Sequence, residues 1–325
     1  MKAFFHHRLV NGRLGDPCLY VRLHRERRSL LFDLGDVSSL TTAEMNRITD
    51  VFVTHMHIDH FIGFDLLLRK TLRREQPLSI YGPPGIIGCI EGKLRGYSFN
   101  LIEEYPIVIN AFSFDGKEVE HVVFSAKQRF IQSRLVRAVS DGTLIENPIF
   151  KVRAVLLDHG IPCLAYSLEE DHHINIYKDR LIRRGLGVGQ WLTTFKSMLR
   201  EKAPLEETII VDNREYSLRD LAEIARITKG QKICFVTDIG ISEKNIAAVT
   251  GLVRDADILF CEAYYLEADR PIAIRRHHLT ARTCGLFAKA AGVKRLEVMH
   301  FSPRYKECPE LIIREAQEAF QENGC

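Results

Sequence analysis

Three histidines and an aspartate lie close together in the segment Thr54-His55-Met56-His57-Ile58-Asp59-His60. Imidazole and carboxylate groups are common ligands of divalent metals such as zinc. The segment directly follows the apolar run 51–53, which is typical of a buried strand. Alternate side chains of extended backbone lie on one face, so His55 and His57 can reach one ion. The turn that follows lets the aspartate and the last histidine face a second ion, and the pattern predicts a two-metal site.

Three further candidate ligands each follow an apolar run elsewhere in the chain, and they are His159, Asp238 and His300. The loops after strands are where α/β folds place their ligands. Any one of these residues alone is more typical of an ordinary core or surface position. The whole set, in the order His-x-His-x-Asp-His, His, Asp, His, is far more specific. We therefore expect seven side chains to converge on a pair of ions.

Short apolar runs alternate with helical patterns along the chain. Strands are predicted at 30–33, 51–54, 78–81, 152–157, 209–211, 233–237, 258–260 and 296–299. Several of them are apolar throughout, as expected for strands that helices cover on both faces. Thr280 can cap a helix that ends at Gly292, and an amphipathic helix is predicted after Pro309. The alternation predicts an α/β fold with the candidate ligands at strand ends.

The composition is that of a globular protein with a large core. Of 325 residues, 46% are hydrophobic and 27% charged. No apolar run approaches the roughly 18 residues of a membrane-spanning helix, and the first residues lack the apolar region of a secretory signal. The net charge of +3 is too small to indicate a nucleic-acid-binding protein by itself. Eight scattered cysteines without a Cys-x-x-Cys spacing favour reduced thiols and a cytoplasmic protein.

One stretch, Tyr177 to Lys202, has a composition of its own. It carries seven basic and two acidic residues, a net +5 that exceeds the charge of the whole chain. It also contains three glycines at alternate positions from Gly185 to Gly189 and the single tryptophan, Trp191. Such a charge run is often only a solvated helix and loop. The functional interpretation is a basic arm for a polyanion.

Five segments give the chain a resemblance to the metallo-β-lactamase superfamily, and within it to the ribonuclease Z branch, the endonucleases that trim the 3′ ends of tRNA precursors. The His-rich motif is common to the superfamily, whereas the last two of these segments indicate the ribonuclease branch. The segments are Leu31-Phe32-Asp33-Leu34-Gly35, Ile80-Tyr81-Gly82-Pro83-Pro84-Gly85, Phe260-Cys261-Glu262-Ala263, His278-Leu279-Thr280-Ala281 and Met299-His300-Phe301-Ser302-Pro303-Arg304-Tyr305.

The resemblance implies a metallo-β-lactamase-type four-layer αβ/βα sandwich, as a single domain over 1–325 with an inserted basic arm at about 171–205. It also implies a homodimer. Two Zn²⁺ are the implied cofactors, with Mn²⁺ or Fe possible because His/Asp sites accept each of them. One zinc would take His55, His57 and His159, the other Asp59, His60 and His300, with Asp238 bridging them. Asp33 would support the histidine loop.

The expected reaction is the hydrolysis of a phosphodiester. A pair of cations makes a hydroxide available near neutral pH, and Asp59 can hold or deprotonate it. His278 is the candidate proton donor to the leaving ribose oxygen, oriented by Glu262. Its neighbour His277 is the alternative, although the Leu-Thr-Ala that follows favours His278. Arg304, Ser302 and Thr280 are the predicted phosphate contacts, Arg304 through its planar fork of donors.

Two departures from the branch's pattern concern the substrate. The segment Asp36-Val37-Ser38-Ser39 replaces Glu-Gly-Thr-Gln, and Cys261-Glu262-Ala263-Tyr264 replaces His-Glu-Ala-Thr. Three functions therefore remain open. The first is endonucleolytic cleavage of tRNA precursors at the 3′ trailer. The second is hydrolysis of a small phosphodiester or another ester by a related metallo-hydrolase, and the third is an inactive RNA-binding subunit.

Overall fold

The computed structural model describes residues 4–24 and 26–322. The chain divides into two compact units. One consists of Met1–Leu144, Val152–Ser167 and Lys232–Cys325, and the other of Ile145–Lys151 and Leu168–Gln231. Every candidate metal ligand lies in the first, larger unit. Among the described residues, no helix combines the length and the apolar character that crossing a membrane requires.

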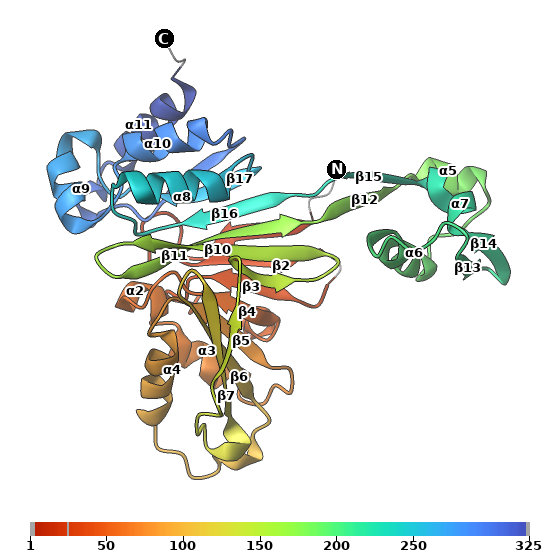
Figure 1. Ribbon diagram of the computed structural model, residues 1–325, viewed down its shortest axis with the longest axis horizontal. Coiled ribbons are helices and arrows are strands. Elements are labelled where there is room, and N and C mark those ends of the chain that lie inside the picture. Colours follow the sequence, from red (N-terminus) through yellow and green to blue (C-terminus); the bar gives the residue numbers. More distant parts are fainter. Residues whose placement is uncertain (1–3, 25, 323–325) are drawn as a thin grey trace. The chain divides into compact units, whose positions relative to one another are not determined.

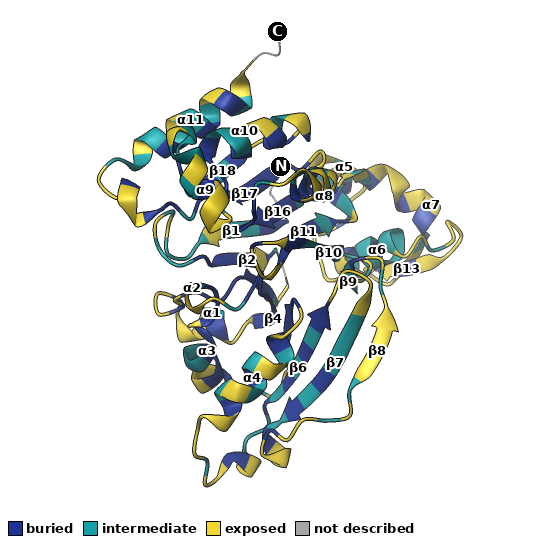
Figure 2. Cartoon of the chain, turned by 60° about the vertical axis from the view of Figure 1, so that its left-hand side comes forward, coloured by how far each residue is buried: buried dark blue, intermediate teal, exposed yellow. Residues whose placement is uncertain are grey.

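An eight-stranded sheet forms the N-terminal half of the larger unit, with its strands in the order of the sequence (Figure 1). Strands β3 to β6 are parallel, and the flanking pairs are antiparallel. Figure 2 shows that β8 at the edge is exposed along its length. The strands are β1 (Phe5–Leu9), β2 (Leu19–Leu23), β3 (Ser29–Phe32), β4 (Ile48–Phe52), β5 (Leu78–Gly82), β6 (Val108–Phe114), β7 (Glu118–Ser125) and β8 (Val136–Val139).

A second sheet has six strands, in the order β18-β17-β16-β11-β10-β9. Its strands β16, β17 and β18 are parallel, so their carboxyl ends meet at one edge. The strands are β9 (Thr143–Glu146), β10 (Phe150–Asp158), β11 (Pro162–Glu170), β16 (Lys232–Val236), β17 (Ile258–Glu262) and β18 (Leu296–Met299).

Helices cover one face of each sheet. Helices α3 (Phe64–Thr71) and α4 (Ile86–Arg95) contribute Leu67, Ile90 and other residues to an apolar core with the first sheet. A second core lies between the second sheet and the helices α8 (Glu243–Val253), α10 (Ala281–Ala290) and α11 (Pro309–Gln321). The predicted cap is confirmed, because the Thr280 hydroxyl accepts from the backbone N–H of Thr283 at the start of α10.

The two sheets face each other through large aromatic side chains. The ring of Tyr166 on β11 lies 6.0 Å from Phe32 and 5.5 Å from Phe52, and its hydroxyl donates to the Val53 carbonyl at 2.6 Å. Each sheet therefore has helices on one face and the other sheet on the opposite face. The αβ/βα sandwich is confirmed. The expectation of helices on both faces of the apolar strands was wrong, since a second sheet buries an apolar strand equally well.

The smaller unit has its own secondary structure and core. Strands β12 (His172–Ile176) and β15 (Ala225–Lys229) pair antiparallel, and β13 (Thr208–Val211) forms a hairpin with β14 (Arg214–Ser217). Its helices are α5 (Lys178–Arg183), α6 (Trp191–Arg200) and α7 (Leu218–Leu221), packed around the fully buried Phe195. This unit contains the basic stretch and extends beyond the 171–205 expected for an arm.

Two glycines allow the chain to bring its histidine-rich helix, α2 (Ile58–Phe61), close to the loop after β3. A Cβ atom on Gly63 would lie 2.2 Å from the carbonyl oxygen of Gly35, so only glycine fits there. The backbone N–H of Leu34 donates to the His60 carbonyl at 2.9 Å, and that of Gly63 donates to the Leu34 carbonyl at 2.9 Å. These contacts hold the loop that carries Asp33 beside the histidine cluster.

Candidate metal centre

The histidine cluster lies where β4 passes into α2. His55 and His57 occupy the extended segment, and their ring centroids are 4.3 Å apart. His57 is also the N-cap residue of α2, whose first turn carries Asp59 and His60. His55 and His60 are completely buried, whereas the Asp59 side chain is 44% exposed. The segment thus presents two buried imidazoles, the exposed imidazole of His57 and one accessible carboxylate.

Asp238 is the centre of the site. It follows β16 and is 2% exposed. Five imidazoles lie around its two carboxylate oxygens, that of His278 with Nδ1 3.7 Å from Oδ1 and those of four candidate ligands. These contacts run from Oδ2 to Nε2 of His55 (3.4 Å), His60 (3.2 Å) and His159 (3.7 Å), and from Oδ1 to Nδ1 of His300 (2.7 Å). His159 follows β10 and His300 follows β18. The structure therefore brings the three remote candidates to the local cluster.

The ligand atoms form groups that share members. One group is His55, His57, His159 and Asp238, and another is Asp59, His60 and His300, each with its ligand atoms within 4.8 Å of one another. Asp238 also belongs with His300, Glu262 and His278 in a third group. The first two groups, with Asp238 central, match the ligand sets that the resemblance implied.

Three residues of the site have left-handed backbone. The φ angles are 58° for Asp33, 55° for Asp238 and 54° for His300, and none of these residues is glycine. This conformation is costly for residues with a Cβ atom, and such residues are concentrated at functional sites. Each of the three follows a strand, so the turn of the backbone directs the side chain to the site rather than along the sheet.

The outer nitrogens of the histidines are held by hydrogen bonds. Nδ1 of His60 donates to Oδ2 of Asp33 at 2.8 Å, and Nδ1 of His159 donates to the His277 carbonyl at 2.7 Å. The hydroxyl of Thr54 donates to Oδ2 of Asp33 at 3.0 Å and accepts from Nδ1 of His55 at 3.1 Å. These bonds fix each ring and direct its Nε2 toward Asp238.

Two buried nitrogen atoms identify the kind of group that fits here. Nε2 of His55 and Nε2 of His60 are buried without a hydrogen-bond partner, which is costly for a polar atom. Burial also lowers the pKa of His55 to about 2, so its imidazole is neutral. A neutral imidazole with a free lone pair is a metal ligand. The donor set of imidazoles and carboxylates thus fits divalent metal ions.

The charges of the site also favour positively charged ions. Burial favours the neutral form of Asp238, but His300 and His60 outweigh it and hold the pKa of the carboxyl well below its usual range. Burial opposes protonation of His300, but Asp238 outweighs it and raises the pKa of the imidazole to about 9. The buried carboxylate therefore requires positive charge beside it, which protonated histidines or metal ions can supply.

The second candidate pair, His278 and Glu262, lies beside the ligands. Nδ1 of His278 donates to Oε2 of Glu262 at 2.8 Å. Glu262 is fully buried, and its Oε1 also accepts from the backbone N–H groups of Ile239 (2.8 Å) and Leu279 (3.3 Å). His277 instead ends α9 (Arg270–Arg276) with left-handed backbone, and it contacts His159 through its carbonyl. His278, not His277, is thus the imidazole that contacts Glu262, and its role as the proton donor stays a prediction.

The three predicted phosphate contacts have partners within the chain. The Arg304 side chain is 52% exposed and donates to Asp269 at 2.9 Å. The Thr280 hydroxyl is buried, caps α10 and donates to Glu267. The Ser302 hydroxyl accepts from the backbone N–H of Arg304. The contacts of these residues with a substrate stay a prediction, and only Arg304 has an accessible charged group.

Sequence reasoning missed two residues of the site. Thr54 directly precedes the first histidine, and its position between strand and cluster was the signal that could have identified it. Tyr264 was noted only as a departure, and its ring lies against that of His278. The other departure, Cys261, is fully buried in the core beneath α10, where it serves as a small apolar residue.

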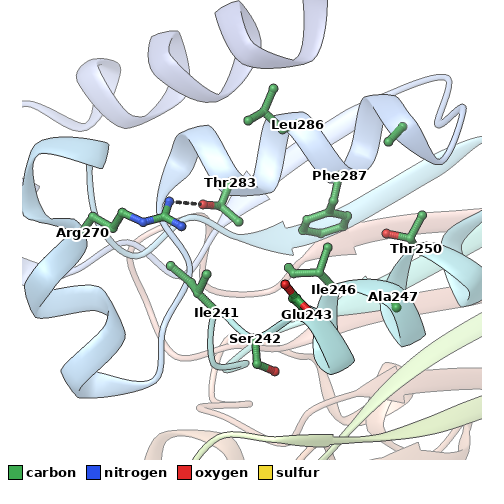
Figure 3. Close-up of a pocket in the computed structure, with 11 residues that line it drawn as sticks. Ile241, Ser242, Glu243, Ile246, Ala247, Thr250, Arg270, Thr283, Leu286 and Phe287 are labelled. Carbon is green, nitrogen blue, oxygen red and sulfur yellow. Dashed lines mark hydrogen bonds between the residues drawn. The ribbon is translucent and has the colours of Figure 1, made fainter.

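An open groove of about 710 Å³ lies elsewhere in the larger unit (Figure 3). Mainly apolar residues of α8 and α10 line it, with Arg270 donating to the Thr283 hydroxyl at one end. No candidate ligand is among its lining residues. This groove is therefore separate from the metal centre.

Comparison with known proteins identifies relatives over nearly the whole chain. A ribonuclease Z of Deinococcus radiodurans is 31% identical over 296 residues, covering 90% of this chain and 88% of that protein. A ribonuclease Z of Bacillus subtilis is 29% identical over 309 residues, covering 92% and 87%. A search of protein-family models finds no match.

Solved structures agree on the fold. The short form of human tRNase Z is similar with a TM-score of 0.56 at 22% identity, over 93% of this chain and 92% of that one. A metallo-β-lactamase fold protein of Bacillus subtilis also gives 0.56, at 14% identity over 96% and 92%. The sandwich is thus the metallo-β-lactamase fold. With the relationship to the bacterial enzymes over most of its length, the chain belongs to the ribonuclease Z family.

Proposed function

We propose that this protein is a metal-dependent endoribonuclease that cleaves tRNA precursors at the 3′ trailer. The observation that carries the proposal is the convergence of seven candidate ligands, Asp238 among them, in a chain related to proteins named ribonuclease Z. The alternative of a small-ester hydrolase is not favoured, because the relatives that match most of the chain are named ribonuclease Z. The inactive subunit is disfavoured by the complete ligand set.

We propose two Zn²⁺ as the metals. His55, His57 and His159 would hold one, His60, His300 and Asp59 the other, and Asp238 both. When bound, the metals supply an activated water at neutral pH and positive charge for the phosphoryl oxygens. Zinc rather than manganese or iron, the homodimer and the cytoplasmic location rest on family likeness and on the cysteine pattern, and they stay predictions.

Two side chains would move the protons of the reaction. The accessible carboxylate of Asp59 holds the attacking water and accepts its proton. The water oxygen forms a bond to phosphorus while the bond from phosphorus to the ribose oxygen breaks. His278 gives the Nε2 proton to that leaving oxygen, while Glu262 holds Nδ1. Arg304 can exchange its exposed contact with Asp269 for a substrate phosphate.

The basic stretch is proposed as an RNA-binding surface of the smaller unit. Several of its cations are already engaged: Arg183 pairs with Asp179, Arg184 pairs with Glu223, and Arg180 lies 4.3 Å over the ring of Tyr177. Lys178 and Lys202 are exposed, and they are the cations most available to RNA phosphates.

The proposed activity is tested with a tRNA precursor that carries a 3′ trailer, incubated with the purified protein and Zn²⁺ or Mn²⁺. We expect one cut that releases the trailer, read by gel electrophoresis against a mature-length marker. Bis(p-nitrophenyl) phosphate serves as the small-ester comparison. Hydrolysis of this compound with the precursor left intact would contradict the proposal and support the small-ester function.

The Asp33→Ala variant should bind zinc about 10- to 100-fold more weakly, because it removes the carboxylate that fixes the ring of His60. The measurement is competition with a chromogenic zinc chelator, with folding checked by circular dichroism. Asp36→Ala is the matched control, since Asp36 is exposed and its side chain bonds, among the described residues, only Ser38 two positions further along. Equal affinities of the two variants would show that Asp33 does not support the site.

Replacing Lys178 and Lys202 by alanine should raise KM for the precursor, because each lysine would neutralise an RNA phosphate. The slope of log affinity against log salt should fall by about one for each lysine that binds a phosphate. Hydrolysis of bis(p-nitrophenyl) phosphate should stay unchanged. The control removes two exposed lysines of the larger unit, Lys117 and Lys127. An equal effect in the control, or an equal loss with both substrates, would argue against RNA binding by the smaller unit.

A further inference from the structure

The ring of Tyr264 lies flat on the imidazole of His278. The two centroids are 3.9 Å apart, and the planes differ by 10°. Tyr264 stands two residues after Glu262, the residue that binds Nδ1 of the same imidazole. His278 is therefore held both at its edge and on one face, by two residues that flank Ala263 at the end of β17.

One hydrogen bond does not fix the orientation of an imidazole ring. The bond from Nδ1 to Glu262 sets the position of one atom, but the ring plane can still tilt about that atom. The opposite nitrogen, Nε2, moves with any such tilt. Since proton transfer requires Nε2 within hydrogen-bond reach of the leaving oxygen, the tilt changes the fraction of molecules that are ready to react.

Tyr264 is itself well held. Its carbonyl accepts from the backbone N–H of Ser302 at 3.1 Å, which ties it to the loop after β18. Its ring packs edge-on against Tyr265 at 5.0 Å and against His300 at 5.1 Å. The side chain is half-buried, so the surrounding protein supports part of the ring.

We propose that Tyr264 is a positioning residue, whose ring sets the plane of His278 and thereby the place where Nε2 delivers its proton. The inference rests on the proposed function, in which His278 is the proton donor. It concerns the aromatic ring and not the hydroxyl, because only the ring lies on the imidazole. Stacked aromatic pairs are common and modest in strength, and the expected loss on removing the ring is about 3- to 10-fold in kcat.

The test is a double-mutant cycle with Tyr264→Leu, Tyr264→Phe, His278→Ala and the Tyr264→Leu/His278→Ala double variant. Precursor cleavage is measured as kcat and KM, with bound zinc determined for each protein. Tyr264→Leu should lower kcat about 3- to 10-fold with KM little changed, and Tyr264→Phe should restore it. In the His278→Ala background, Tyr264→Leu should have no further effect. An equal loss in both backgrounds, or a loss in Tyr264→Phe like that in Tyr264→Leu, would overturn the inference.

A second readout does not depend on activity. The Cε1–H proton of His278 in the zinc-loaded protein, identified by its loss in His278→Ala, should carry an upfield ring-current shift. Tyr264→Leu should abolish the shift and Tyr264→Phe should retain it. An unshifted wild-type signal would overturn the inference. A wild-type protein with the shift and no precursor cleavage would refute the proposed function alone.

Discussion

A buried carboxylate among imidazoles is the interaction on which the rest of this site depends. Asp238 is nearly inaccessible, and nitrogen atoms of five histidines lie within 4 Å of its two oxygens. A buried negative charge is tolerated only with compensating positive charge and well-placed polar partners. The arrangement is therefore stable as a protonated cluster or as a metal centre, and the unpartnered Nε2 atoms of His55 and His60 favour the metal.

The fold supplies what this cluster needs from distant parts of the sequence. Strands β4, β10, β16 and β18 all end at this site. Their candidate ligands lie far apart in the sequence, from His55 after β4 to His300 after β18. Left-handed backbone at Asp33, Asp238 and His300 turns the chain sharply after each strand. The aromatic contacts between the two sheets and the packing of the two apolar cores offset the free-energy cost of these backbone conformations.

Much of this could be predicted from the sequence, because the local cluster is a short pattern and the remote ligands follow apolar strands. The strands before His159, Asp238 and His300 are recognisable from their runs of apolar residues. Two antiparallel edge strands were not predicted: β1 contains two histidines and an arginine, and β8 is short and exposed along its length. The face-to-face packing of two sheets was not predicted from the apolar runs either, since burial by a sheet and by a helix leaves the same pattern.

Contacts that depend on how distant segments pack together could not be predicted from the sequence. Nothing in the chain's pattern shows that Glu262 accepts from Ile239 and Leu279, or that Tyr264 lies on His278. Thr280 was predicted both as a helix cap and as a phosphate contact, and the structure confirms the cap. The sequence likewise showed the charge of the basic stretch but not the buried core around Phe195.

If Asp238 joins two metal positions, its replacement by asparagine should remove at least one ion, which metal analysis of Asp238→Asn beside the wild type measures. The substitution preserves shape and removes the negative charge that the histidines surround. After loading with zinc and removal of free metal, we predict about two ions per chain for the wild type and at most one for a folded Asp238→Asn protein. Two ions retained by the variant would show that Asp238 does not join two metal positions, and a folded wild type that binds no ion would show that the site is not a metal centre.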